Sequence, residues 1–184
     1  LNRELKPRLA LPGQVKQRFL GAVTHKGVMT LYDTALIQCP KVYELHDRCG
    51  LAHGLLTHLL SGAVAKGYDV VACPNPMAPQ RLAHLLIPQA GLAFLSVTPR
   101  QSPAEKPWRR VRIETGVGGD LMRRSRPRIR FAQKVGEALM EEAVASLAQA
   151  KAMHDDLEAI YHPYVDFSLV DRTAQELAQT ILEK

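Results

Sequence analysis

The fold of this chain is decided by the stretch KVYELHDRCGLAHGLLTHLLSGAVAKGYDVVAC, which covers residues 41–73. Its first residues, 41–47, alternate in character and include aromatic and β-branched side chains, which is typical of a strand. From Leu55 onward, leucine and alanine recur at helical spacing until Gly67, a residue type that commonly follows the end of a helix. Residues 68–73 then read as a second strand. This succession of strand, helix and strand predicts a parallel α/β sheet.

The residues that follow extend the same pattern. Prolines mark a loop over residues 74–79, and residues 80–86 predict a short helix. Residues 91–97 form an apolar run that is typical of a strand buried on both faces of a sheet. We therefore expect an α/β fold with a mostly parallel sheet and right-handed crossovers.

Three further segments differ in composition. Residues 1–20 read as an irregular lead-in to a single domain over residues 21–184. Residues 99–130 are interrupted by proline and glycine and read as a basic irregular loop. Residues 131–184 predict a helical C-terminal part, made of a long helix up to Tyr161 and a last, capped helix after it. We expect these helices to pack on the sheet.

Composition excludes several classes of protein. The chain has 184 residues, of which 46% are apolar, enough for one domain with a sizeable core. No apolar run approaches the roughly 18 residues of a membrane span, and no signal peptide is visible. We expect a cytoplasmic protein that does not bind membranes. Because the sequence begins at Leu1 without Met, we expect it to be part of a longer protein.

The three cysteines indicate neither a disulfide framework nor a zinc site. Their spacing is wide and their number is odd, which fits neither a disulfide framework nor a zinc ribbon. We expect free thiols buried in a reducing compartment. The residues concerned are Cys39, Cys49 and Cys73.

The net charge of +6 is unevenly distributed along the chain. Residues 99–136 carry 11 Lys or Arg against 3 Asp or Glu, whereas residues 137–184 carry 3 against 10. Packing of these segments against each other would neutralise both. Alternatively, the arginines of residues 108–130 could contact nucleic-acid phosphates, although Trp108 is the only aromatic side chain among them. One of these arginines could also reach a nucleotide held by another domain.

The turn at residues 47–54 occupies the position of a P-loop, the phosphate-binding turn between a strand and a helix. A P-loop has the pattern G-x-x-x-x-G-K-[ST], in which backbone N–H groups surround phosphates while the Lys and the hydroxyl contact phosphate and Mg²⁺. Here Asp47 stands at the first glycine, Ala52 at the second, His53 at the lysine and Gly54 at the hydroxyl residue. The pattern is therefore lost at every anchor position.

Four short segments nevertheless share a family likeness. They are Thr24-His25-Lys26-Gly27, Gly67-Tyr68-Asp69-Val70 with Cys73-Pro74, Leu86-Ile87-Pro88 with Gly91 and Thr98-Pro99, and Ala150-Lys151-Ala152-Met153-His154-Asp155-Asp156-Leu157-Glu158. Together they resemble the second half of an uncharacterised bacterial ATPase family with two tandem P-loop domains. The last segment is the most specific, since it resembles the family's A-K-x-x-H-D-x-L-E signature. The resemblance implies a P-loop NTPase fold and an N-terminal P-loop half as partner.

The departures from this family determine the predicted function. Besides the lost Lys and hydroxyl, the acidic residue expected after the third strand is Ser96 here. The groups that stabilise a transferring phosphoryl group are therefore missing. We predict a degenerate P-loop domain with no catalytic residue and no metal site of its own. It would support or regulate the N-terminal half of the same protein, or form a homo-oligomer.

Two alternative functions remain open. The first is a weak site for ATP and Mg²⁺, in which Arg48, Gly50, His53, Gly54 and Leu55 would bind the nucleotide. Phosphate proximity would favour a charged His53, and the N–H groups of Gly54 and Leu55 at the start of the helix would attract an anion. The second alternative is a basic module that binds nucleic acid or another anion through residues 108–130.

Overall fold

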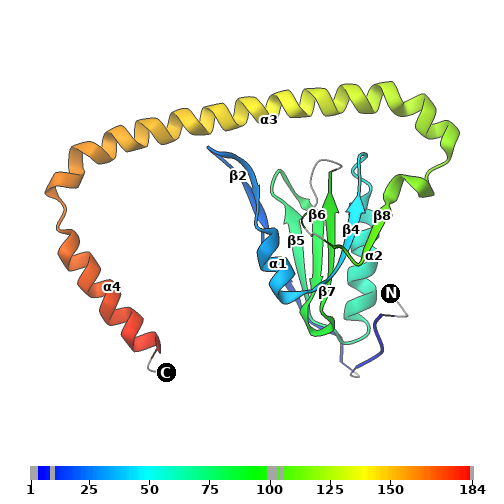
Figure 1. Ribbon diagram of the computed structural model, residues 1–184, viewed down its shortest axis with the longest axis horizontal. Coiled ribbons are helices and arrows are strands. Elements are labelled where there is room, and N and C mark those ends of the chain that lie inside the picture. The colour runs from blue at the N-terminus through cyan, green and yellow to red at the C-terminus, as the bar shows by residue number, and fades with distance from the viewer. Residues whose placement is uncertain (1–3, 9–10, 99–102, 104–105, 183–184) are drawn as a thin grey trace.

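The computed structural model describes residues 4–8, 11–98, 103 and 106–182, and it shows a sheet-containing body with a long helical arm (Figure 1). Six strands form the main sheet: β1 (Val15–Gln17), β4 (Lys41–His46), β5 (Val70–Asn75), β6 (Ala78–Ile87), β7 (Leu92–Val97) and β8 (Arg109–Arg112). Their order across the sheet is β1-β5-β6-β7-β4-β8. Among these described strands only β6 runs against the others, so the mostly parallel α/β sheet is confirmed.

The two faces of the sheet are covered differently. Helix α2 (Ala52–Val64) covers one face, where Leu45 and Leu56 belong to the larger core. On the other face, Val42 and Leu95 belong to a second core together with Ala35 of helix α1 (Tyr32–Gln38). The antiparallel hairpin of β2 (Gly21–Thr24) and β3 (Gly27–Thr30) also lies on this second face (Figure 1).

The strand–helix–strand unit that decides the fold is present. The strand predicted over residues 41–47 is β4, and the following helix begins at Ala52, a few residues earlier than its apolar spacing indicated. The strands predicted over residues 68–73 and 91–97 are β5 and β7. Strand β4 pairs in parallel with β7 on one side and with β8 on the other, so the turn after β4 lies at the carboxyl edge of this parallel group.

The short helix predicted over residues 80–86 is wrong, because these residues belong to β6. This strand pairs antiparallel with both β5 and β7. Its last four residues, 84–87, are all buried. The sequence there therefore lacks the alternation of apolar and polar residues that marks a half-exposed strand. A short apolar run of this kind cannot be distinguished from a helix by its period. The reversed strand separates β5 from β7.

Two segments that were expected to be irregular contribute regular structure. Within residues 1–20, β1 pairs with β5, and the side chain of Leu5 is fully buried in the larger core. Within the expected loop at 99–130, the structure has β8, a short 3₁₀ turn η2 (Ile113–Gly116) and the beginning of helix α3 (Gly119–Tyr161). Residues 99–102 and 104–105 of that loop lie outside the described residues.

Helix α3 continues through Pro127 and bends in its first part (Figure 1). Proline lacks the N–H that would bond to the preceding turn, and its ring crowds that turn, which accounts for a bend at this place. Beyond the bend the helix runs past the hairpin of β2 and β3, with which it is in contact. The long helix predicted from the sequence is confirmed, and it starts well before the expected residue 131.

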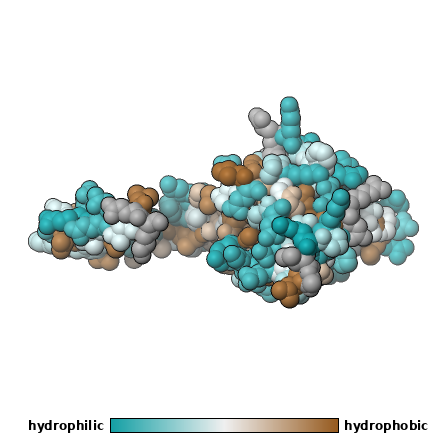
Figure 2. All heavy atoms as spheres, turned by 90° about the horizontal axis from the view of Figure 1, so that it is seen from below, coloured by the Kyte–Doolittle hydropathy of each residue, from teal (hydrophilic) through white to brown (hydrophobic). Residues whose placement is uncertain are grey.

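The predicted packing of the C-terminal helices on the sheet is wrong. Helix α3, the short η3 (His162–Tyr164) and helix α4 (Phe167–Leu182) form an arm in which no described residue is buried. Leu177 and Ile181, which the sequence pattern places on a buried face of α4, are 59% and 71% exposed. Figure 2 shows apolar side chains at the surface of this arm, between α4 and the body. Among the described residues, no helix has both the length and the apolar character that a membrane span requires.

Candidate functional site

The turn between β4 and α2 is closed by the carboxylate of Asp47. One carboxylate oxygen accepts a hydrogen bond from the N–H of Cys49 at 2.9 Å, and the other accepts one from the N–H of Ala52 at 2.6 Å. Gly50 lies between these donors with φ of +71°, a backbone conformation that favours glycine. The N-terminus of a helix attracts anions, so the carboxylate occupies the position where an external phosphate would be favoured.

Residues of the body and of α3 make further hydrogen bonds to the turn. The N–H of Arg48 donates to a carboxylate oxygen of Glu114 in η2 at 2.5 Å. The carbonyl oxygen of Arg48 accepts a hydrogen bond from the side-chain amide of Gln133 in α3 at 2.8 Å. The carbonyl oxygen of Gly50 accepts one from the guanidinium of Arg81 in β6. The turn is therefore fixed by groups of its own chain, among them two carboxylates.

The five predicted nucleotide-binding residues do not converge on one place. The Nδ1 atom of His53 accepts a hydrogen bond from the N–H of Leu82 in β6 at 3.0 Å, so this ring nitrogen already has a partner within the chain. His53 and Gly50 line the same cavity, of about 200 Å³. Arg48 lines a different one. Gly54 is exposed on α2, and Leu55 packs against the larger core.

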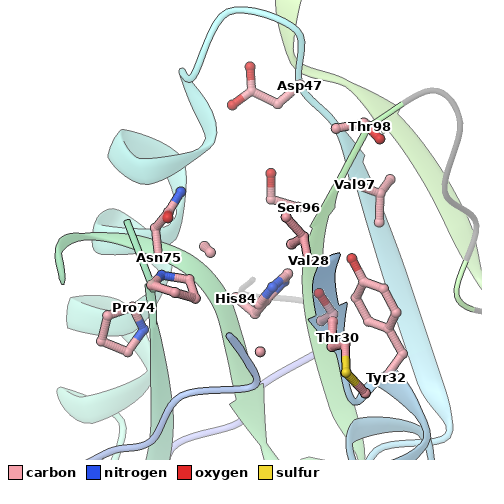
Figure 3. A pocket seen from close by; sticks show the side chains of 14 residues that line it. Val28, Thr30, Tyr32, Asp47, Pro74, Asn75, His84, Ser96, Val97 and Thr98 are labelled. Carbon is pink, nitrogen blue, oxygen red and sulfur yellow. The ribbon is translucent and has the colours of Figure 1, made fainter. Parts of the chain in front are cut away.

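A second cavity, of about 210 Å³, opens beside the turn at the carboxyl ends of β5 and β7. In Figure 3, Asn75 lies on one side of it and Tyr32 on the other, with Ser96 and His84 between them and Asp47 above. Ligands of open α/β sheets bind outside the carboxyl ends of the parallel strands. The cavity therefore has a position that is suitable for a ligand, and Ser96 offers a hydroxyl where a P-loop ATPase would offer a carboxylate.

His84 is the unusual residue of this second cavity. Its side chain is 8% exposed, and its Nδ1 atom has no hydrogen-bond partner within the part of the chain that the structure describes. Burial lowers the pKa of the imidazole to about 4, so the ring is neutral at physiological pH. The ring of Tyr32 meets it edge-on at 5.8 Å between centroids. Sequence reasoning missed this residue because it lies in the segment that was read as a helix.

A third cavity separates the turn from the first part of α3. It is the largest of the three, at about 440 Å³. Its lining comes from two directions: Arg48 and Cys49 belong to the turn, and the other residues belong to α3. The α3 residues are Gly119, Met122, Arg123, Arg126, Ile129, Arg130 and Gln133. The basic segment predicted from the sequence is thus brought next to the turn between β4 and α2.

Arg110, another arginine of the basic segment, has a structural role. Glu44 is a fully buried carboxylate on β4, and its Oε2 atom lies 3.1 Å from the Nε atom of Arg110 on β8. The Nε2 atom of His46 lies 3.3 Å from the same oxygen. A buried carboxylate needs such partners, because desolvation of an unpaired charge is costly. Arg110 therefore joins the edge strand β8 to the sheet.

The family-like signature on α3 lies outside these cavities. His154, Asp155 and Glu158 offer ligand atoms within 4.8 Å of one another on this helix. Asp155 is paired with Lys151, and the Nδ1 atom of His154 lies 3.5 Å from a carboxylate oxygen of Glu158. These are the four-residue contacts that are expected on a helix surface.

The cysteines agree with the sequence-based expectation at two positions. Cys39 and Cys73 are buried free thiols, and burial raises the pKa of each to about 11. Cys49 is also a free thiol, but it is half-buried at the third cavity.

Comparison of the chain with models of known protein families, with curated proteins and with solved structures found no match. A functional assignment must therefore be argued from the closed turn, the cavities and the exposed arm.

Proposed function

We propose that this chain is a degenerate P-loop-like domain that has no catalytic activity of its own and that assembles through its helical arm. The observation that carries the proposal is the pair of hydrogen bonds from the N–H groups of Cys49 and Ala52 to the carboxylate of Asp47. The succession of strand, turn and helix supports this reading, in which the chain's own carboxylate takes the place that a phosphate has in a P-loop.

Electrostatics argues against a nucleotide phosphate in this turn. A phosphate oxygen about 4 Å from the Asp47 carboxylate would meet a repulsion of about 4 kcal/mol at the effective dielectric constant of a protein surface. In an ATPase, a lysine and a Mg²⁺ ion held by a hydroxyl and a carboxylate offset such a charge. Here Gly54 stands at the position of the hydroxyl residue and Ser96 at that of the carboxylate, so neither of these Mg²⁺ ligands is present. His53 is in turn engaged by the N–H of Leu82.

The arm has the properties of an assembly surface. Apolar side chains recur along α3 every three or four residues, and they are substantially exposed: Val135 40%, Leu139 67%, Leu147 41% and Leu157 55%. A continuous exposed apolar stripe of this length is typical of a surface that another protein covers. We take a second copy of this chain as the occupant, because of the charges that accompany the stripe.

The charges on α3 complement each other when two copies run antiparallel. Residues 119–134 carry six Lys or Arg and one Asp, whereas residues 137–158 carry six Asp or Glu and one Lys. The two halves belong to one helix and cannot pair within a chain. In an antiparallel pair that crosses near residue 138, residues 119–134 of each helix lie opposite residues 142–157 of the other, and complementary charges of this kind set partner and orientation.

Sedimentation velocity tests the assembly. We expect a dimer at low salt that weakens between 0.05 and 1 M NaCl, and a monomer for the variant Leu139→Asp/Leu147→Asp. Ile37→Asp is a matched control, because Ile37 is 84% exposed on α1 of the body and should leave the dimer unchanged. A wild-type monomer at high micromolar concentration and low salt would refute the assembly, and would leave the N-terminal P-loop half as the partner to test.

An ATP hydrolysis assay tests the absence of catalysis. We expect no turnover above background, with or without Mg²⁺, and the same result for His53→Ala. Turnover by the wild type that His53→Ala abolishes would contradict the proposal and support a weak ATPase.

A further inference from the structure

We propose that the third cavity, between the turn and α3, binds the phosphate groups of a small ligand that carries a chain of two or three phosphates. We call this cavity the arginine pocket and define it by four residues: Arg48, Arg123, Arg126 and Arg130. Nothing in the inference depends on a nucleotide entering the turn itself.

The arginine pocket is built from two sides. Arg123, Arg126 and Arg130 are three, four and seven residues apart on α3, so their side chains share one face of the helix. Arg48 comes from the turn on the opposite side of the cavity. Four arginines thus line one hollow of about 440 Å³, a volume within the usual range for small-molecule sites.

The charge of this pocket is largely uncompensated by the described part of the chain. Arg123 lies 3.9 Å from Asp120, and both side chains are more than four-fifths exposed, so this pair contributes little. Within the described residues, the structure shows no ion pair for the side chains of Arg48, Arg126 or Arg130. The nearby carboxylate of Glu114 accepts a hydrogen bond from the backbone N–H of Arg48. An anion in the pocket would relieve the repulsion among these like charges.

A chain of phosphates suits a pocket that is lined by four arginines. The planar guanidinium group offers paired N–H donors that match two oxygens of one phosphate, and several arginines can share a chain of phosphates. Met122 and Ile129 add an apolar wall for an uncharged part of the ligand.

An extended nucleic acid fits this pocket less well. Arg124 and Arg128 would be needed to continue a phosphate track along α3, but their positions fall on a different face of the helix from Arg126 and Arg130. These two arginines are therefore a matched control: they have the same charge and lie on the same helix, but they do not line the pocket.

Calorimetric titration tests the proposal with defined probes. The full chain is titrated without Mg²⁺ with inorganic triphosphate, with ATP and with a single-stranded 20-nucleotide DNA. We expect triphosphate to bind, with at least tenfold weaker binding to Arg126→Gln/Arg130→Gln and a change of less than twofold for Arg124→Gln/Arg128→Gln. ATP that binds as tightly as triphosphate or more tightly supports a small phosphorylated ligand. All substituted side chains are exposed, and circular dichroism verifies that α3 is retained.

Two results of the titration would overturn the proposal. One is triphosphate and ATP binding that is weaker than millimolar. The other is DNA binding that both double variants reduce equally, which would indicate a nucleic-acid surface along α3 in place of a pocket. Arg123, Arg126 and Arg130 also belong to the basic half of α3 that the proposed assembly uses. The titration is therefore repeated with Leu139→Asp/Leu147→Asp, which is expected to be monomeric, and triphosphate binding that this variant retains belongs to the pocket and not to the assembly.

Cys49 supplies a second readout, because it lines the pocket and is a free thiol. We expect triphosphate to slow the labelling of Cys49 by a thiol reagent at least threefold in the wild type, and not in Arg126→Gln/Arg130→Gln. The buried thiols Cys39 and Cys73 report whether the body opens during the experiment. Labelling of Cys49 that saturating triphosphate leaves unchanged would show that the ligand does not occupy this cavity.

Discussion

Replacing Asp47 with alanine should open the turn and destabilise the body. The variant loses a charged acceptor of two hydrogen bonds, which the N–H of Cys49 donates at 2.9 Å and the N–H of Ala52 at 2.6 Å. Ala52 is only 2% exposed, so water cannot readily replace the lost acceptor. Loss of a helix-capping carboxylate costs about 0.5–2 kcal/mol, and a hydrogen bond to a charged group contributes about 1.5–3 kcal/mol. We therefore expect Asp47→Ala to lower the free energy of unfolding by about 2–3 kcal/mol.

Urea unfolding, followed by the fluorescence of the single tryptophan Trp108, measures this loss. Asp47→Asn should show roughly half the loss of Asp47→Ala, because the amide keeps one acceptor oxygen but not the charge. A loss below about 0.5 kcal/mol for Asp47→Ala, within the range of ordinary surface substitutions, would refute the reasoning that the carboxylate holds the turn.

The same variant should acquire an anion site in the turn. Once Asp47 is removed, the N–H groups of Cys49 and Ala52 are free to bind sulfate. At ten times its dissociation constant, sulfate would then stabilise Asp47→Ala by about 1.4 kcal/mol more than it stabilises the wild type. The comparison is made against NaCl at equal ionic strength. Any contribution of the arginine pocket is present in both proteins and cancels in the difference. Equal stabilisation of the two proteins would contradict the interpretation of Asp47 as a phosphate substitute.

Three further predictions concern residues of the body. His84 has a pKa of about 4 in the folded state and about 6.5 when unfolded, so the unfolded chain binds the proton more strongly. The contribution of neutral His84 to the free energy of unfolding should therefore be fully present above pH 6.5, and up to about 3 kcal/mol of it should be lost as the pH falls to 4. Urea unfolding of His84→Leu should lack this pH dependence. A thiol reagent should label Cys49 of the native protein first and the two buried cysteines only on unfolding, as mass spectrometry can verify. Gly13→Ala should be strongly destabilising in thermal unfolding, because its Cβ would lie 1.9 Å from the carbonyl oxygen of Tyr68. Gly54→Ala has open space around it in α2, and the same measurement should show an increase in stability of up to about 1 kcal/mol.

The parts of the fold that could be predicted are those with a strong local signal. The leucine spacing of α2 arises from burial on one side of the helix, so the sequence shows it directly. Strand β4 is covered on both faces, and its signal is its aromatic and β-branched side chains, Tyr43 and Val42. Strand β6 lacks such a signal because residues 84–87 are buried on both faces. The amphipathic pattern of α4 predicts an apolar face but not what covers it, and in this structure the face is exposed.

The candidate site could be located from the sequence but not described. The position of the turn follows from the strand and the helix on either side of it, and the sequence shows that the turn lacks the anchor residues of a P-loop pattern. The role of Asp47 as an internal acceptor depends on the backbone path through Gly50, which no motif encodes. The arginine pocket joins residue 48 to residues 123–130, and a contact over such a separation has no local signature.

The amide resonances of the turn test the central claim most directly. The measurement is an NMR titration of the ¹⁵N-labelled Arg126→Gln/Arg130→Gln variant with ATP and Mg²⁺, so that binding in the arginine pocket does not interfere. We expect the amides of Cys49 and Ala52 to exchange slowly with solvent and not to shift as ATP and Mg²⁺ are added. Saturable shifts of these amides that disappear in His53→Ala would show that the turn binds nucleotide, and would contradict the account.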